Sequence, residues 1–158
     1  MPVLFRFPLS ATSMRRAAAL ASVLALVGVG PASWAQTGAI DAFRALGEKP
    51  GLVALMDDFV PRLFQDPRTA RFFKSTNQRH LKEQLVDQVC AVLGGPCAYE
   101  GAPMKEAHSD LGITKADFLA LVDILQDTMD ARGVPFAVQN RLLAQLAPMH
   151  RDIVEARP

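Results

Sequence analysis

Apolar positions along most of this chain recur every three to four residues, the spacing of one face of an α-helix. Strict two-residue alternation, which is typical of a half-buried strand, is absent. The pattern therefore predicts an all-α fold. The expected helices are Ala39 to Leu46, Leu52 to Phe64, a brief piece from Thr69 to Phe73, Gln78 to about Leu93, Thr114 to about Arg132, and a last helix from Pro135 to about Glu155.

Residue types at the ends of these segments predict where the helices start and stop. Gly47 and Pro50-Gly51 are expected to stop the first helix, and the second is expected to begin at Leu52. Pro61 removes one backbone donor inside the second helix and should kink it. Gly94 supplies the left-handed conformation that closes the third long helix. Thr114 and Asp117 have the spacing of a capping box, which marks the start of the next one.

The apolar stripes on the longer helices are interpreted as core first and as the wall of a pocket second. They comprise Leu81, Leu85, Val89 and Leu93, then Phe118, Leu121, Val122, Leu125 and Met129, then Val138, Leu142, Leu146, Met149 and Ile153.

The first 35 residues have the three-part pattern of a secretory signal. A basic start at Met14-Arg-Arg precedes the uncharged apolar run from Ala17 to Val29, which is shorter than the ~20 residues that span a bilayer. Small residues in Ser33-Trp-Ala35 predict cleavage between Ala35 and Gln36. We therefore expect residues 1–35 to be removed and 36–158 to form one periplasmic domain. An uncleaved anchor is the second choice, and Met1 and Met14 both remain possible initiators.

Removal of residues 1–35 takes away three of the 17 Lys and Arg and none of the 16 Asp and Glu, so the mature charge is −2. A small domain so near neutrality lacks the electrostatic footprint of a nucleic-acid or anionic-lipid partner. We expect no nucleic-acid partner, and no stable membrane anchor after cleavage.

Two cysteines, Cys90 and Cys97, remain after the predicted cleavage. A zinc site would need further ligands at local spacing, and there are none. Gly94-Gly95-Pro96 can turn the chain back so that the two Cα atoms approach within the ~4.4–6.8 Å of a disulfide. A disulfide and two free thiols are equally open, because Cys90 also suits a buried apolar position.

The sequence motifs of hydrolases and nucleotide-binding loops are missing, since neither Gly-x-Ser-x-Gly nor a phosphate loop occurs. Among the three histidines, His108 sits on a short amphipathic turn before a long apolar helix. His150 neighbours Arg151 and Asp152, which indicates a surface position. His80, at the start of the third long helix, stays open.

A set of short motifs in chain order is more specific than any one of its members. The set is Asp58-Phe59, Asp66-Pro67, Phe72-Phe73, Thr76-Asn77, Leu93-Gly94-Gly95-Pro96, Tyr99-x-Gly101, Met104, His108, Ile113-Thr114 and Phe118. With it, the chain from Leu52 to Val154 resembles the group 1 truncated globins. The resemblance implies a two-over-two helical sandwich that encloses haem b.

The resemblance also implies roles for individual residues. His108 matches the proximal ligand, which is the one metal ligand expected, and a neutral imidazole suits haem iron. Phe73 matches the haem-packing aromatic. The rest of the implied haem wall is Val60, Leu81 and Leu85 on the distal side, with Met104, Ile113, Phe118 and Leu121 elsewhere.

The distal side departs from the family's usual pattern. The family's tyrosine, which donates a hydrogen bond to bound dioxygen, matches Val60, and the two iron-facing positions of the distal helix match Leu81 and Leu85. Gln84 and Gln88 flank these two leucines. An apolar distal pocket does not favour tight oxygen storage or rapid nitric oxide dioxygenation, whereas carbon monoxide and nitric oxide depend less on hydrogen bonds.

The leading functional interpretation is an exported haem protein that reversibly binds a diatomic gas, O2, NO or CO, and draws on an unidentified electron donor. The alternatives are a low-turnover haem enzyme acting on nitric oxide or peroxide, a bis-histidine electron-transfer protein if His80 ligates iron, and a haem-free helical domain. We expect His80 on the flank of the distal helix, because it is turned roughly 100° from Leu81. The sequence favours ligand binding over a dedicated enzyme without deciding between them.

Overall fold

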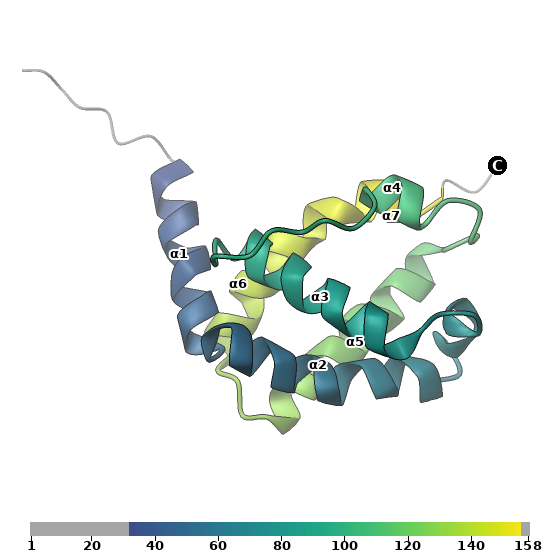
Figure 1. Ribbon diagram of the computed structural model, residues 1–158, viewed down its shortest axis with the longest axis horizontal. Coiled ribbons are helices and arrows are strands. Elements are labelled where there is room, and N and C mark those ends of the chain that lie inside the picture. Colours follow the sequence, from purple (N-terminus) through teal and green to yellow (C-terminus); the bar gives the residue numbers. More distant parts are fainter. Residues whose placement is uncertain (1–31, 156–158) are drawn as a thin grey trace, which may run out of the picture.

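The computed structural model describes residues 32–155, with side chains from residue 38 onward. Every regular element in this range is helical, which confirms the predicted all-α class (Figure 1). The elements are α1 (Ala32–Ala45), α2 (Glu48–Gln65), η1 (Ala70–Phe73), α3 (Gln78–Val92), α4 (Met104–Ala107), α5 (Lys115–Ala131), α6 (Phe136–Leu146), η2 (Ala147–Met149) and α7 (His150–Ile153). The predicted signal segment lies outside the described residues, apart from the backbone of 32–35, where α1 begins.

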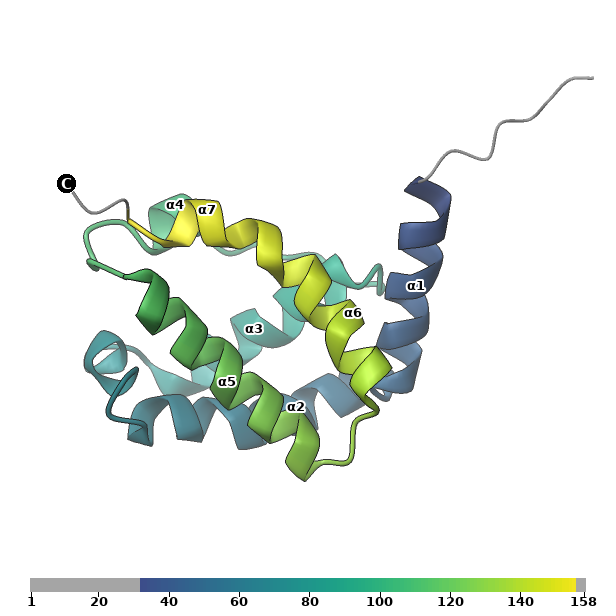
Figure 2. The same ribbon diagram turned by 180° about the vertical axis from the view of Figure 1, so that it is seen from behind.

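Two pairs of helices form the two layers of the molecule. The α2/α3 pair makes one layer and the α5/α6 pair the other, as the front and back views show (Figures 1 and 2). α1 stands at one end and packs against α6 and the start of α2. The short helices α4 and α7 lie side by side away from α1. Among the described helices, none is long and apolar enough to cross a membrane.

The buried core lies toward the α1 end. It draws on α1 and α2, and on the parts of α3, α5 and α6 that lie nearest to them. Its largest fully buried apolar side chains are Leu52, Leu55, Met56, Val60, Leu63, Cys90, Leu93, Met129 and Leu142. Each large aliphatic side chain buried in this way contributes about 1.5–3 kcal/mol. The predicted apolar stripes are thus buried in the half of the molecule nearest to α1. In the half that is farther from α1 they are only partly buried.

The first helix stops before Gly47, as predicted, but α2 begins directly after it at Glu48 and not at the expected Leu52. Gly47 has a φ of +85°, the left-handed conformation that glycine tolerates. Pro50 is then the third residue of α2. Amide groups in the first turn of a helix have no intrahelical acceptor, so a proline there loses no hydrogen bond. Pro61 lies inside α2, which continues to Gln65.

The end of α3 is closed both by hydrogen bonds and by a covalent bridge. Gly94 has a φ of +74°, as predicted, and the Gly95 amide donates to the carbonyl of Cys90 at 2.8 Å. Cys90 and Cys97 form a disulfide with their Cα atoms 5.7 Å apart, which answers the question that the sequence left open. A side chain at Gly95 would press on Cys90 Sγ and on the ring of Phe43, so the turn requires glycine here.

The predicted capping box at the start of α5 is present. The Asp117 amide donates to Thr114 Oγ1 at 3.3 Å, while the Asp117 carboxylate accepts from the hydroxyl and amide of Thr114 at 2.7 and 3.0 Å. These two bonds, with the guanidinium of Arg71 at 2.8 Å, hold the pKa of Asp117 below its usual value. The box fixes the direction in which α5 leaves the preceding loop.

The prediction of one unbroken last helix was wrong. α6 ends at Leu146, a 3₁₀ turn follows, and α7 starts at His150. Pro148 lies in that turn, and because proline has no amide hydrogen it cannot continue the α-helical ladder. The break redirects the chain so that α7 packs against α4.

Candidate functional site

His108 lies at the C-terminal end of α4, half-buried. Its Nδ1 atom lies 2.8 Å from the carbonyl oxygen of Met104. A carbonyl oxygen only accepts hydrogen bonds, so Nδ1 is the donor in this pairing. For the neutral imidazole, this bond selects the tautomer in which Nε2 has the lone pair that binds metals.

The loop after His108 is fastened to the end of the chain. Asp110 and Gly112 adopt left-handed conformations with φ of +60° and +63°. The Gly112 amide donates to the Glu155 carboxylate at 2.9 Å, and the Glu155 amide donates to the carbonyl of Ile113 at 3.0 Å. These two bonds hold the loop between His108 and α5 in place.

The predicted distal residues are apolar and come from two helices. Leu81 and Leu85 lie one turn apart on α3, half-buried against the core, and Val60 on α2 is 1% exposed. Phe73 of η1 stacks on Phe64, with ring centroids 5.4 Å apart. None of Val60, Leu81 and Leu85 carries a hydrogen-bond donor on its side chain.

α5 supplies Phe118 and Leu121, both half-buried. The ring of Phe118 meets the imidazole of His150 edge-on, with centroids 4.9 Å apart and planes at 83°. The prediction that His150 is a surface residue was therefore wrong. Its charged neighbours are exposed, but the turn at Pro148 aims the imidazole inward, and sequence reasoning missed that turn.

Gln88 ties α3 to the segments on the far side of the site. Its amide is buried and donates to the sulfurs of Met104 at 3.2 Å and Met149 at 3.4 Å. Thioether sulfur is a weak acceptor, so the buried amide is only weakly satisfied. Gln88 thus bridges the helix that carries the distal leucines and the helix that ends at His108.

Gln84, one turn earlier, carries the buried side-chain oxygen that lacks a hydrogen-bond partner in the described part of the chain. This oxygen lies against Gly101, where any side chain would overlap it and the ring of Tyr99. The Tyr99 hydroxyl donates to the carbonyl of Ala102 at 3.1 Å, and burial raises the pKa of Tyr99. The loop before α4 therefore depends on glycine for its close approach to α3.

His80 is exposed in the first turn of α3, and its amide donates to the side chain of the capping residue Asn77 at 3.0 Å. This position agrees with the expected place on the flank of the helix.

Seven of the nine predicted site residues share one property, which is partial burial. They are Phe73, Leu81, Leu85, Met104, His108, Phe118 and Leu121. The other two, Val60 and Ile113, are buried. Half-covered apolar side chains, together with an imidazole that has one ring nitrogen unbonded, fit the chemistry of a flat, apolar, iron-bearing cofactor such as haem. No cluster of three or more His, Cys, Asp or Glu side chains occurs within the described range.

Comparisons with known proteins agree with this fit. A sequence model described as "Bacterial-like globin" matches residues 41–155. The chain is similar to the Group 1 truncated hemoglobin GlbN of Mycolicibacterium paratuberculosis, with 35% identity over 70% of this chain and 82% of the relative. It is also similar to the Group 1 truncated hemoglobin of Tetrahymena pyriformis, with 30% identity over 71% and 93% of the two chains.

Solved structures give the same result for the fold. The crystal structure of truncated hemoglobin from Tetrahymena pyriformis in the Fe(III) form superposes with a TM-score of 0.70 and 29% identity. The match covers 73% of this chain and 98% of that one.

Proposed function

Because this chain belongs to the bacterial-like globin family, as a group 1 truncated globin, we propose that it is an exported haem b protein that reversibly binds a diatomic gas through His108. Membership makes it a globin haem protein. We propose four further points: the cofactor is haem b, His108 ligates its iron, the ligand is a diatomic gas, and the protein is exported.

The observation that carries the proposal is the state of His108. Its Nδ1 donates to the Met104 carbonyl, which in the neutral imidazole leaves the lone pair on Nε2, and most of the proposed haem wall is only half covered. A bound haem supplies an iron with a free coordination position for a small gas. The chain orients the imidazole and excludes water with Phe73, Phe118 and Leu121.

The distal residues favour gases that need little hydrogen bonding. Val60, Leu81 and Leu85 offer a bound gas apolar contact and no donor. Polarity of the distal pocket is one of the features by which a globin selects its ligand. We therefore propose carbon monoxide or nitric oxide as better ligands than dioxygen held in tight storage.

The alternative of a bis-histidine electron-transfer protein has less support. His80 would have to leave its exposed place in the first turn of α3, where its amide is bonded to the capping Asn77. The alternative of a haem enzyme acting on nitric oxide or peroxide would need an acid or base on the distal side. Val60, Leu81 and Leu85 carry none, which leaves His80 or one of the flanking glutamines, Gln84 and Gln88. A five-coordinate gas-binding protein needs neither.

Export is proposed from the pattern of residues 14–35 and is supported by the disulfide between Cys90 and Cys97. Disulfides persist in the periplasm and are rare in the cytosol. The electron donor that keeps the iron reduced is left open.

The deciding experiment is an absorption spectrum of purified protein, oxidised and reduced, with and without carbon monoxide. We expect one haem b per chain and a five-coordinate, high-spin ferrous form that shifts on addition of carbon monoxide. A low-spin ferrous spectrum that turns high-spin only in His80→Ala would favour the bis-histidine alternative. A purified protein that takes up no haem would favour the alternative of a haem-free helical domain.

A further inference from the structure

Two arginines at η1 reach across to α5. Arg71 Nη2 donates to Asp117 Oδ1 at 2.8 Å, and Arg68 Nη1 donates to Asp123 Oδ2 at 3.2 Å. The partners of these pairs are 46 and 55 residues apart in the chain. The segment around η1 is therefore linked to α5 by charge at two points.

The η1 segment has little burial of its own. None of the four residues of η1 is fully buried, and its two aromatic side chains, Phe72 and Phe73, are half-buried. Its recorded anchors on α2 are the stacking of Phe73 on Phe64 and the bond from the buried Thr69 hydroxyl to the carbonyl of Leu63 at 2.8 Å. With so little apolar burial, ion pairs carry a larger share of what holds this segment in place.

Both partners of the Arg71–Asp117 pair are held before they meet. The guanidinium carbon of Arg71 lies 4.6 Å from the centroid of the Phe72 ring, which is a cation–π distance. The Asp117 side chain is 13% exposed and accepts hydrogen bonds from the hydroxyl and amide of Thr114. Ordering two free side chains is part of the cost of a surface ion pair, so this pair should contribute more than one between mobile groups.

Each partner lies beside an aromatic residue of the proposed haem wall. Phe73 comes two residues after Arg71 in η1, and Phe118 directly follows Asp117 in α5. η1 and the start of α5 lie at the same end of the molecule, away from α1 (Figure 2). The ion pair therefore connects the two segments that supply these aromatic side chains.

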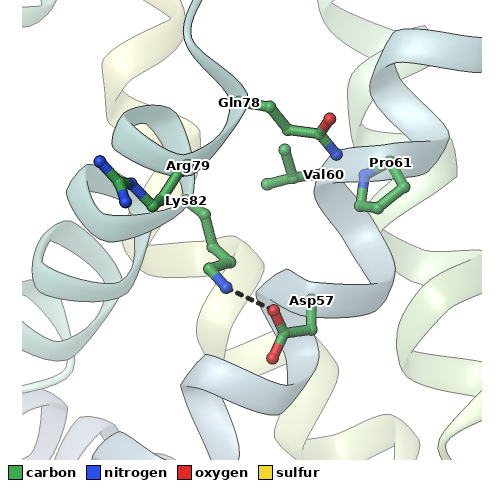
Figure 3. A pocket seen from close by; sticks show the side chains of 6 residues that line it. All are labelled: Asp57, Val60, Pro61, Gln78, Arg79 and Lys82. Carbon is green, nitrogen blue, oxygen red and sulfur yellow. Dashed lines mark hydrogen bonds and ion pairs between the residues drawn. The ribbon is translucent and has the colours of Figure 1, made fainter.

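Two ion pairs between α2 and α3 differ in this respect. Lys82 Nζ lies 2.6 Å from Asp57 Oδ1 beside an open pocket of about 310 Å³ (Figure 3). Lys49 Nζ lies 2.8 Å from Asp87 Oδ1. α2 and α3 also pack against each other and share buried apolar side chains in the core. Loss of either pair leaves these two helices joined by their apolar contact.

We propose that the Arg71–Asp117 pair is a clasp that holds η1 and α5 together and so sets how long haem stays bound. The Arg68–Asp123 pair is a second link, more exposed, with side chains 48% and 58% exposed. The inference rests on the proposed function. Arg71 acts as a positioning residue, because opening of the clasp allows η1 to move away from α5 and widens the path by which haem leaves.

The test measures the rate at which the haem-loaded protein loses haem to an excess of apomyoglobin. Arg71→Met removes the charge and keeps an apolar stem over Phe72. We expect haem loss to become about two- to fivefold faster, the range for loss of one exposed ion pair. Arg71→Lys keeps the charge without the planar guanidinium, so its rate should lie between those of the wild type and Arg71→Met.

Salt gives a second readout of the same pair. Salt screens exposed charges, so 0.5 M sodium chloride should speed haem loss from the wild type more than from Arg71→Met. The dissociation constant for carbon monoxide should be that of the wild type in Arg71→Met, because the clasp acts on the haem pocket's closure and not on the iron.

Lys49→Met is the matched control, because it removes an ion pair of the same length between two other elements. Urea unfolding of the haem-free proteins should show similar small losses of stability in Lys49→Met and Arg71→Met. Haem loss should be faster in Arg71→Met alone. This difference separates a clasp from a general loss of stability.

Four results would overturn the clasp. These are a wild-type rate of haem loss in Arg71→Met, an equal acceleration in Lys49→Met, an acceleration that Arg71→Lys shares in full, or a shifted dissociation constant for carbon monoxide. Each leaves the proposed function intact, because haem and carbon monoxide still bind. A wild-type chain that takes up no haem overturns the proposed function, and the clasp with it.

Discussion

The Nδ1 atom of His108 lies 2.8 Å from the carbonyl oxygen of Met104, one helical turn earlier in the chain. This bond fixes both the tautomer and the direction of the imidazole ring. It is made within a helix of four residues that starts after Pro103. The local sequence therefore fixes, without any cofactor, which ring nitrogen is left for the proposed iron ligation.

His108→Ala should lose haem or hold it loosely, because no other described side chain replaces the imidazole. The measurement is haem content per chain, with the ferrous spectrum. His80→Ala is the control and should keep both. An unaltered spectrum and full haem content in His108→Ala would show that another residue is the ligand.

Leu85→Gln should slow dissociation of dioxygen by about tenfold, because one added hydrogen bond is worth roughly 1–1.5 kcal/mol. Carbon monoxide, which gains less from such a bond, should respond less. Stopped-flow release of dioxygen measures the effect, and Leu85→Met serves as an apolar control of similar size. Equal rates in the glutamine variant and the wild type would mean that residue 85 does not face the bound gas.

Cys97→Ser should lower the free energy of unfolding by up to ~2.5 kcal/mol, the chain-entropy value for so short a loop. Urea unfolding measures the loss, and the wild type under reducing conditions should lose the same amount. Iodoacetamide should alkylate no thiol in the unreduced, denatured wild type. Two alkylated thiols per chain would contradict the bridge between Cys90 and Cys97.

Asp117→Ala should lower the free energy of unfolding at neutral pH by about 1 kcal/mol, through loss of the cap of α5. The folded pKa of Asp117 is depressed from 3.8, so its contribution is present above that value and is lost as pH falls through the folded pKa. The two proteins should therefore converge in strong acid. Urea midpoints across pH test this, with Asp127→Ala, exposed on the same helix, as control.

Protein recovered from its native envelope should begin at or near Gln36. Mass spectrometry of the intact chain gives the N-terminus directly. An intact Met14 start in the soluble cytoplasm would contradict export.

The sequence predicted the long helices well because each buries a stripe with a clear period. α3 starts at Gln78 and α5 within a residue of Thr114, both as predicted. The errors came from prolines. Pro50 was read as a break although the first turn of a helix accepts it, and Pro148 was overlooked although it breaks the last helix.

The parts of the site that consist of residues close together in the sequence were predictable from it. His108 and its carbonyl partner are four residues apart, so the segment carries its own signal. The bond from Gln88 to Met149 spans 61 residues, and that from Gly112 to Glu155 spans 43. Such pairs depend on how the helices pack. The periodic pattern of a single sequence predicts helices but not which distant residues meet. The inward turn of His150 was missed for the same reason.

The uneven burial of the apolar residues has a consequence for how resistant the protein is to proteases. The covered core lies toward α1, while the segment from Tyr99 to Gly112, which includes α4, consists of residues that are half-buried or exposed. Segments with few buried contacts open first, and proteases cut the opened state. A bound cofactor stabilises the closed state by mass action. We therefore expect copies that lack haem to be degraded first, so that the supply of cofactor limits how much protein accumulates.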